Sequence, residues 1–163
     1  MKILTQKELT ERLLYDEKTG VFVWRKTGAV AGGLCGNGYI QIRISTVRYS
    51  AHRLAWLYVY GVTPALQIDH INRVKTDNRI SNLRLATRSQ NMINTPPPTT
   101  NKTGVKGVSY CKKARKYRAR CWVNQKRYHL GWFDSIDGAA SAYKDFAIKH
   151  YGAFAVDGRG SAA

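Results

Sequence analysis

Residues 67–94 read QIDHINRVKTDNRISNLRLATRSQNMIN, and this stretch decides the fold prediction for the first half of the chain. A short apolar strand ends in Asp69 and His70, and a polar loop with Asp and Asn at turn positions follows it. Residues 83–86 read as a second short strand. Thr87 and Gln90 then form a capping-box pattern, which predicts a helix beginning near residue 88. The predicted order is strand, loop, strand, helix.

This unit gathers four polar side chains from separate segments: Asp69, His70, Asn82 and Asn91. Carboxylate and amide oxygens suit a hard divalent cation, and Asp69 and Asn91 supply them. A neutral imidazole at His70 can take a proton from water, and Asn82 is placed to hold that ring in one tautomer. An Asp–His pair alone is more often structural, but the four residues together predict metal-assisted hydrolysis of a phosphodiester.

The preceding segment predicts a helix, a sheet and a second helix. Thr5 and Glu8 form a capping-box pattern before three leucines at helical spacing. Residues 21–25 and 39–44 read as strands, the second because its isoleucines alternate with polar residues. A further helix begins after Ser50 and ends at Gly61. The helical leucines are Leu9, Leu13 and Leu14, and the isoleucines are Ile40, Ile42 and Ile44.

The stretches AHRLAWLYVYG and IDHINRVKTDNRISNLRLATRSQNMIN, within residues 50–94, resemble HNH endonucleases of the phage and intron homing type. The resemblance implies a ββα-metal core at about residues 66–94, in a nuclease domain of residues 1–94. It makes His70 the general base, Asp69 and Asn91 metal ligands, and Asn82 the residue that orients His70. Asn78 is a rival for that last role.

The sequence also bears on the identity of the metal and on the role of a further histidine, His52. Many family members have a histidine where this chain has Asn91, so the resemblance favours Mg²⁺ or Mn²⁺ over Zn²⁺. The three cysteines form no CxxC pair, and no structural zinc is expected. His52 lies in the HRL part of the pattern, and a helix histidine facing the core or the DNA backbone is favoured over a catalytic one.

Residues 95–103 predict a linker, because three consecutive prolines fix the backbone and remove three hydrogen-bond donors. Residues 101–133 beyond it hold ten Lys and Arg and no Asp or Glu. Three strands are predicted there, at residues 105–110, 116–123 and 126–133, with a tight turn at Asn124 and Gln125. A helix from about residue 136 to 151 carries an apolar stripe, Ile136, Ala140, Tyr143 and Ala147.

Alternation along these strands predicts one cationic, aromatic face that suits a DNA groove. The stretches VKGVSY, YRARCW and RYHLGWFDSIDGAASAYKDFAIKHYG resemble the ethylene-response-factor type of DNA-binding domain of plants, here residues 104–155, with 156–163 as a tail. Ser109, Tyr110 and His129 depart from the plant pattern, so no plant target sequence transfers. The predicted DNA-facing residues are Lys106, Ser109, Arg118, Arg120, Trp122, Arg127 and His129.

The fold class is therefore α+β: an HNH nuclease module, then a small three-stranded antiparallel sheet packed on one helix. The net charge of +17 on 163 residues favours a polyanion, and duplex DNA is the expected partner. A non-catalytic DNA-binding regulator with a degenerate nuclease core is the alternative, and an RNA-binding module is a third. No membrane association, signal segment or protein partner is expected. We expect a monomer or weak dimer, intracellular, in a bacterial host's cytoplasm if the phage-type resemblance holds.

Overall fold

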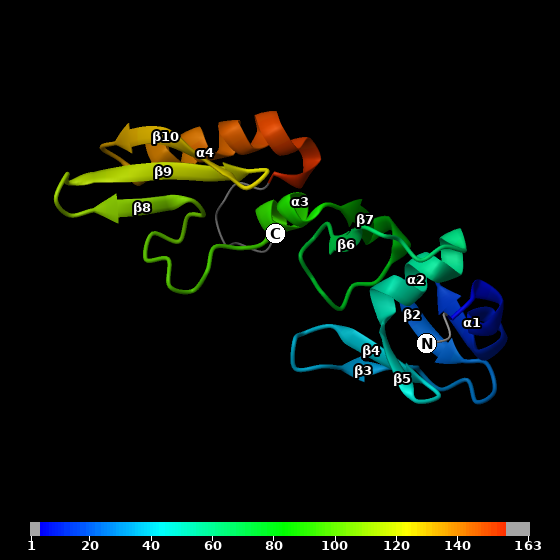
Figure 1. Ribbon diagram of the computed structural model, residues 1–163. Coiled ribbons are helices and arrows are strands. Elements are labelled where there is room, and N and C mark those ends of the chain that lie inside the picture. Colours follow the sequence, from blue (N-terminus) through cyan, green and yellow to red (C-terminus); the bar gives the residue numbers. More distant parts are fainter. Residues whose placement is uncertain (1–3, 156–163) are drawn as a thin grey trace. The chain divides into compact units, whose positions relative to one another are not determined.

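The computed structural model describes residues 4–155, and the predicted tail at 156–163 lies outside them. The chain divides into two compact units, Met1–Leu85 and Ala86–Ala163, and each is described by itself (Figure 1). Among the described residues no helix is long and apolar enough to cross a membrane. The sequence predicts a division at residues 95–103, and this boundary remains a prediction. In the structure the helix before the proline-rich segment groups with the second unit.

The first unit mixes short helices with two-stranded sheets and a three-stranded antiparallel sheet. The elements of this unit are α1 (Gln6–Arg12), β1 (Leu13–Asp16), β2 (Val21–Trp24), β3 (Gly33–Leu34), β4 (Ile40–Ile44), β5 (Val47–Ser50), α2 (Ala51–Tyr60), β6 (Gln67–His70) and β7 (Leu83–Ala86). Pairing joins β1 to β2, β4 to both β3 and β5, and β6 to β7. A 3₁₀ turn, Ile80–Asn82, precedes β7.

The first helix forms as predicted, but it is shorter than its leucines indicate. Thr5 and Glu8 make the reciprocal capping-box bonds that begin α1. The helix ends at Arg12, and Leu13 instead starts β1, where it lies opposite Trp24 of β2. Strand pairing therefore takes over from helical spacing at Leu13, which is completely buried in β1.

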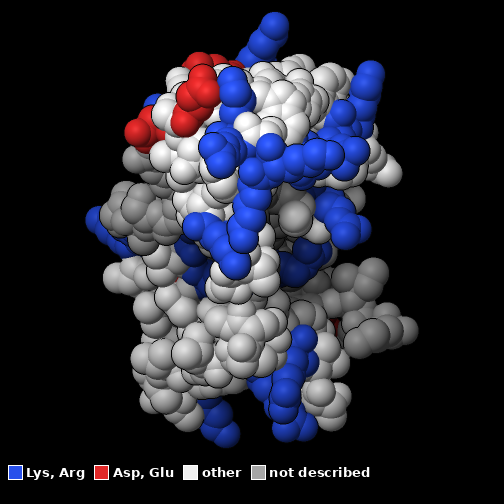
Figure 2. Space-filling model, turned by 90° about the vertical axis from the view of Figure 1, so that its left-hand side faces the viewer, with Lys and Arg blue, Asp and Glu red and all other residues white. Residues whose placement is uncertain are grey.

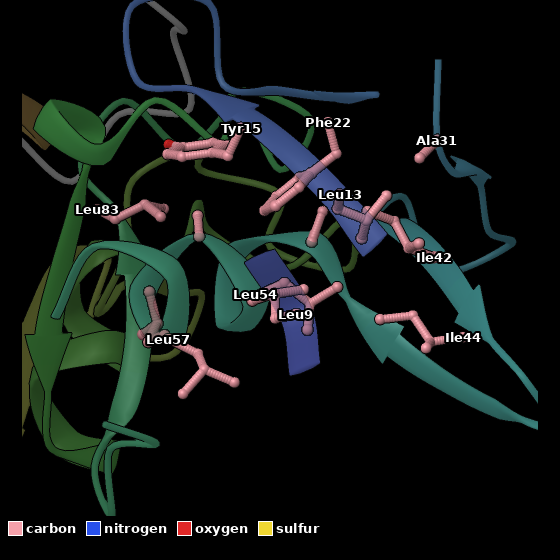
Figure 3. Packing of buried hydrophobic residues seen from close by; sticks show 13 residues of the cluster. Leu9, Leu13, Tyr15, Phe22, Ala31, Ile42, Ile44, Leu54, Leu57 and Leu83 are labelled. Carbon is pink, nitrogen blue, oxygen red and sulfur yellow. The ribbon is translucent and has the colours of Figure 1, made fainter. Parts of the chain in front are cut away.

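The core of the first unit lies between α1, α2 and the strands. Leu9, Leu13, Phe22, Ile42 and Leu54 are almost completely buried and point toward one another (Figure 3). These five side chains come from α1, β1, β2, β4 and α2, so one apolar cluster fixes all five elements. Burial of this kind contributes about 1.5–3 kcal/mol for each large side chain.

The second unit contains a three-stranded antiparallel sheet. Its elements are α3 (Arg88–Asn94), β8 (Val108–Cys111), β9 (Lys116–Val123), β10 (Lys126–Phe133), α4 (Ile136–Tyr151) and the 3₁₀ turn Gly152–Phe154. The order of the strands is β10-β9-β8, and β8 begins three residues later than predicted, after Gly107. The turn between β9 and β10 has positive φ at both Asn124 and Gln125, as a tight hairpin requires.

Small residues let α4 lie close to the strands (Figure 1). Ala139 and Ala140 cluster with Val108 and Ala119 of the strands. Gly107 has a φ of 73°, and a Cβ there would run into the Tyr143 ring and the Arg120 carbonyl. The segment before β8 is therefore pressed against both β9 and α4.

Candidate active site and nucleic-acid interface

His70 and Asp69 are the last two residues of β6, and both are buried, at 4% and 5% exposure. The Nε2 atom of His70 lies 3.2 Å from the Oδ1 atom of Asn78. Asn78 donates from Nδ2 to the Thr76 carbonyl, so its oxygen is the atom that faces the imidazole. This contact assigns the proton of the neutral ring to Nε2, which donates to the amide oxygen of Asn78.

The surroundings of His70 keep it neutral and fixed. Burial lowers the pKa of His70 below its ordinary value of 6.5, although the bond to Asn78 acts in the opposite direction. Asn78 is itself held, because its backbone carbonyl accepts a 2.7 Å bond from the Tyr15 hydroxyl. A neutral imidazole with a defined tautomer is what a general base needs.

The Asn82 side chain does not make the bond to His70 that the sequence predicts. Its Oδ1 accepts from the Asn72 backbone at 3.0 Å, and its Nδ2 donates to Asn72 Oδ1 and to the Asp77 carbonyl. Asn82 is the last residue of the 3₁₀ turn before β7, and the loop folds back onto it, which uses these polar atoms. Asn78, from the middle of that loop, contacts His70 instead.

Asp69 lies beside Arg84 of β7, whose Nε donates to Asp69 Oδ2 at 2.9 Å. Asp77 is committed elsewhere, to Arg79 and Asn72, and the bond from Arg79 lowers the pKa of Asp77 to about 2. Within residues 4–155 no three His, Cys, Asp or Glu gather as a metal site. A divalent ion held here would need amide, water or phosphate oxygens beside Asp69, which is how Mg²⁺ is usually bound.

Two aromatic rings flank His70. The His52 ring is 5.2 Å from the His70 ring at 80°, and the Tyr39 ring is 5.8 Å away. Burial, with His70 and Arg53 nearby, lowers the pKa of His52 to about 4. In the part of the chain that the structure describes, His52 Nδ1 is buried without a hydrogen-bond partner. His52 thus faces the core and the general-base candidate.

Asn91 lies on α3, in the second unit, where it is half-buried. The capping box predicted for this helix is confirmed: Thr87 accepts from the Gln90 backbone, and Gln90 Oε1 accepts from the Thr87 backbone. The helix is seven residues long, so Asn91 lies at its centre.

The strand register brings most of the predicted DNA-facing residues together. Arg127 lies opposite Trp122 and His129 opposite Arg120, and directly opposed residues share a face. Arg118 lies on that face too, because it alternates with Arg120 along β9. Ser109, on β8, is opposite Arg118. Figure 2, which views the molecule from the left-hand side of Figure 1, shows many Lys and Arg side chains at the surface, with most of the visible Asp and Glu at one edge.

The charges on this sheet face are close enough to affect one another. Burial lowers the pKa of Arg120, and the neighbouring Arg118 and Arg127 lower it further. The Arg127 guanidinium lies 5.9 Å from the Trp122 ring, and Trp122 is 59% exposed. A crowded cationic face with an exposed aromatic ring suits a polyanion with flat bases.

Two residues of this module differ from expectation. Lys106 does not face outward with the arginines, because its ammonium donates to backbone carbonyls at the end of α3. Trp132 lies opposite Arg118 and its ring is 5.5 Å from that guanidinium, although the sequence did not place it there. A register shift between His129 and Gly131 changes the alternation. The glycine before Trp132 is the sequence signal that could have located this bulge.

Comparison with known proteins relates this chain to one protein family. The HNH endonuclease family matches residues 49–93. Protein 3.8 of Escherichia phage T7 is 30% identical over 94 residues, 57% of this chain and 78% of that protein. An uncharacterized HNH endonuclease, L560, of Acanthamoeba polyphaga mimivirus is 33% identical over 106 residues, 64% of this chain and 54% of that protein.

A solved structure of the HNH homing endonuclease I-HmuI, in a study of DNA binding and cleavage, is 24% identical with a TM-score of 0.46. The match covers 58% of this chain and 57% of that one. The chain thus spans only about half the length of the mimivirus protein and of I-HmuI. On the family match and the likeness to the phage and mimivirus proteins, this chain belongs to the HNH endonuclease family.

Proposed function

We propose that this chain is a DNA endonuclease that hydrolyses phosphodiester bonds, with His70 as general base and one divalent metal ion. The observation that carries the proposal is the neutral His70 ring, held at Nε2 by Asn78, next in sequence to the buried carboxylate of Asp69. Membership of the HNH family supports a nuclease role.

In this mechanism the His70 Nδ1 atom takes a proton from the water that attacks the phosphorus. Asn78 prevents the ring from rotating and stabilises the imidazolium that forms, since its amide oxygen accepts from Nε2. Asn82 acts on His70 indirectly, because its bonds to Asn72 and Asp77 shape the loop that carries Asn78. Burial of His70 excludes bulk water from the base.

Asp69 and Asn91 are the residues that would hold the metal, as the family resemblance implies. Both offer oxygen atoms, which favours Mg²⁺ or Mn²⁺ over Zn²⁺. A bound ion would supply Lewis-acid stabilisation of the phosphate and of the leaving oxygen. Arg84 offsets the charge of Asp69 when no ion is present, which makes a buried carboxylate tolerable.

In this proposal the second unit provides the affinity for DNA and determines where on the DNA the chain binds. Its sheet resembles the ethylene-response-factor type, and we assign DNA contact to Ser109, Arg118, Arg120, Trp122, Arg127 and His129. The shared face of these residues supports the assignment. Linking the two activities in one chain raises the effective concentration of each at the other's site.

The Asp69–Arg84 ion pair also fits a second function, a non-catalytic DNA-binding regulator in which Asp69 is purely structural. Incubation of the chain with supercoiled plasmid, with Mg²⁺ or with a chelator, separates the two. Metal-dependent conversion to open circle or linear product supports the nuclease, whereas gel retardation without cleavage supports the regulator.

Substitution of the base gives the sharper test. His70→Ala should lower the cleavage rate about 10²–10⁴-fold, since a general base typically contributes that much. His150→Ala, at an exposed helix position in the second unit, is the matched control and should cut like the wild type. Both variants should bind duplex DNA normally in chelator. Wild-type cleavage by His70→Ala would refute the assignment of the base.

A further inference from the structure

The segment between α3 and β8, part of which the sequence predicts to be a linker, turns back on itself beside β8 (Figure 1). Asn101 donates from Nδ2 to the Val105 carbonyl at 2.7 Å. The Thr103 hydroxyl lies 2.7 Å from Asn101 Oδ1 and 3.0 Å from the carbonyl of Val108, the first residue of β8. Residues 98–104, which we call the arm, are therefore attached to the edge strand of the sheet.

The arm forms one side of a groove that has a volume of about 840 Å³. The arm contributes Lys102 to the lining, and the strands contribute Ser109, Arg120, Trp122 and Arg127. All four strand residues belong to the sheet face that the strand register brings together. Lys102 thus lies beside the proposed DNA-binding face, although the sequence does not predict it as a DNA contact.

The groove is strongly cationic. Lys112 lines it as well, so two lysines and two arginines border the same space, and no Asp or Glu is among the described residues of the lining. Lys102 and Lys112 are exposed, and within residues 4–155 neither makes an ion pair with a carboxylate. A concave surface of one charge concentrates its potential and attracts the opposite charge. The groove therefore suits an anion from outside the chain.

The place of Lys102 favours a phosphate of DNA as that anion. The arm lies at the edge of the sheet, where a duplex bound on the sheet face would present the sugar–phosphate backbone of one strand. Lysine suits a phosphate because its ammonium is a compact point charge with three donors. Phosphate contacts beside a base-reading surface fix the position of that surface on the duplex.

We propose that residues 98–104 are a DNA-binding arm: the groove between the arm and the sheet receives the sugar–phosphate backbone of one strand of duplex DNA, with Lys102 on a phosphate. The choice of duplex DNA as the partner rests on the proposed function. The contact involves the second unit alone, and it extends the DNA interface beyond the residues predicted from the sequence. Part of the predicted linker thereby takes a role in DNA binding.

The first test measures binding of the full chain to a labelled duplex of mixed sequence, by anisotropy in chelator over a range of salt. Lys102→Gln removes one phosphate contact, so the plot of log affinity against log salt should flatten by about 0.9, and affinity at 0.1 M salt should fall about 8-fold. Lys144→Gln removes the same charge at an exposed position of α4, which packs on the opposite face of the sheet, and is the matched control. The control should bind like the wild type.

A second pair of variants tests whether the arm must be held in place. Thr103→Val keeps the size and charge of the arm but removes the hydroxyl that contacts Asn101 and β8. Amides of residues 101–105 should exchange faster with solvent, and affinity should fall toward that of Lys102→Gln. Thr103→Ser keeps the hydroxyl and should bind like the wild type. In a Lys102→Gln background Thr103→Val should add little, since both changes act through one contact.

Acetylation of lysines in the full chain, read by mass spectrometry, locates the contact directly. Saturation with the same duplex should protect Lys102 from acetylation and leave Lys144 reactive. A Lys102 side chain that stays as reactive as in the free protein would refute the contact, even if Lys102→Gln weakened binding.

The outcomes separate this inference from the proposed function. Equal salt slopes for the wild type and Lys102→Gln, or equal losses of affinity for Lys102→Gln and Lys144→Gln, would overturn the arm and leave the nuclease proposal intact. A wild type that binds the duplex but does not cut DNA would refute the nuclease, and the comparison of Lys102→Gln with Lys144→Gln would still decide the role of the arm. A wild type that binds no duplex would refute both.

Discussion

Replacement of His52 by phenylalanine should remove an acid sensitivity from the first unit. The His52 ring packs against Tyr39 and His70, with ring centroids 5.2 Å away in both cases. Phenylalanine keeps an aromatic ring in that place and deletes the buried Nδ1 that has no partner in the described chain. The folded protein then has no group at this position that must remain uncharged.

The expected size of the effect follows from the pKa of His52. It is 6.5 ordinarily and about 4 in the folded protein, chiefly because of burial. As the pH falls below 6.5, the unfolded chain takes up a proton that the folded chain refuses, so stability is lost between about pH 6.5 and pH 4. The loss from this one group is about 2 kcal/mol at pH 5 and about 3 kcal/mol at pH 4.

Urea-dependent hydrogen exchange on peptides from β4 and α2 measures the free energy of unfolding of the first unit without interference from the second unit. In chelator, the wild type should lose about 2 kcal/mol more than His52→Phe between pH 7.5 and pH 5. At pH 7.5 the variant should be as stable or more so, since an unpaired buried polar atom costs about 1–3 kcal/mol. Equal losses in the two proteins, or an NMR titration of His52 with a midpoint near 6.5, would refute the reasoning.

Three further predictions concern charge and packing. Arg127→Gln should flatten the plot of log affinity against log salt by about 0.9, measured by anisotropy of a labelled duplex; an unchanged slope would mean that Arg127 touches no phosphate. Asp77→Asn should lose less stability than the wild type between about pH 4 and pH 2, followed by circular dichroism, because the Arg79 bond lowers the pKa of Asp77 to about 2 and is lost on protonation. Ile93→Ala should destabilise the second unit by about 2–5 kcal/mol in thermal unfolding, and a change under 1 kcal/mol would contradict the packing of α3 there.

Local sequence signals predicted the four α-helices and seven of the ten strands among the described residues. The capping boxes at Thr5 and Thr87 form with all their bonds, and the β9–β10 turn has the expected geometry at Asn124 and Gln125. Each of these signals depends on residues within one turn of the chain, which is why the sequence alone reveals them. The strands Leu13–Asp16, Gly33–Leu34 and Val47–Ser50 were not predicted. Strand pairing links separate segments: Leu13, for example, pairs with Trp24, eleven residues away.

The roles assigned to Asp69, His70 and Asn91 come from the family resemblance and stay predictions. The choice between Asn78 and Asn82 depends on how the loop between β6 and β7 folds. Asn82 is used by the loop backbone, and that leaves Asn78 to meet the imidazole. Hydrogen bonds between residues of one long loop are set by its three-dimensional course, which periodicity does not report.

Net charge likewise predicts DNA binding without showing which basic residues are available to a phosphate. Ten basic residues between 101 and 133 would give a salt slope of about −9 if each met a phosphate. Lys106 is bonded to α3, and Lys116 lies 3.1 Å from Asp134, so neither is freely available. The shared face of the sheet offers three arginines, which corresponds to a slope of about −2.7 and a fall in affinity of about 40-fold for a fourfold rise in salt. A measured slope near −9 would therefore mean that DNA meets many cations outside this face, and the assignment of binding to the sheet would have to be abandoned.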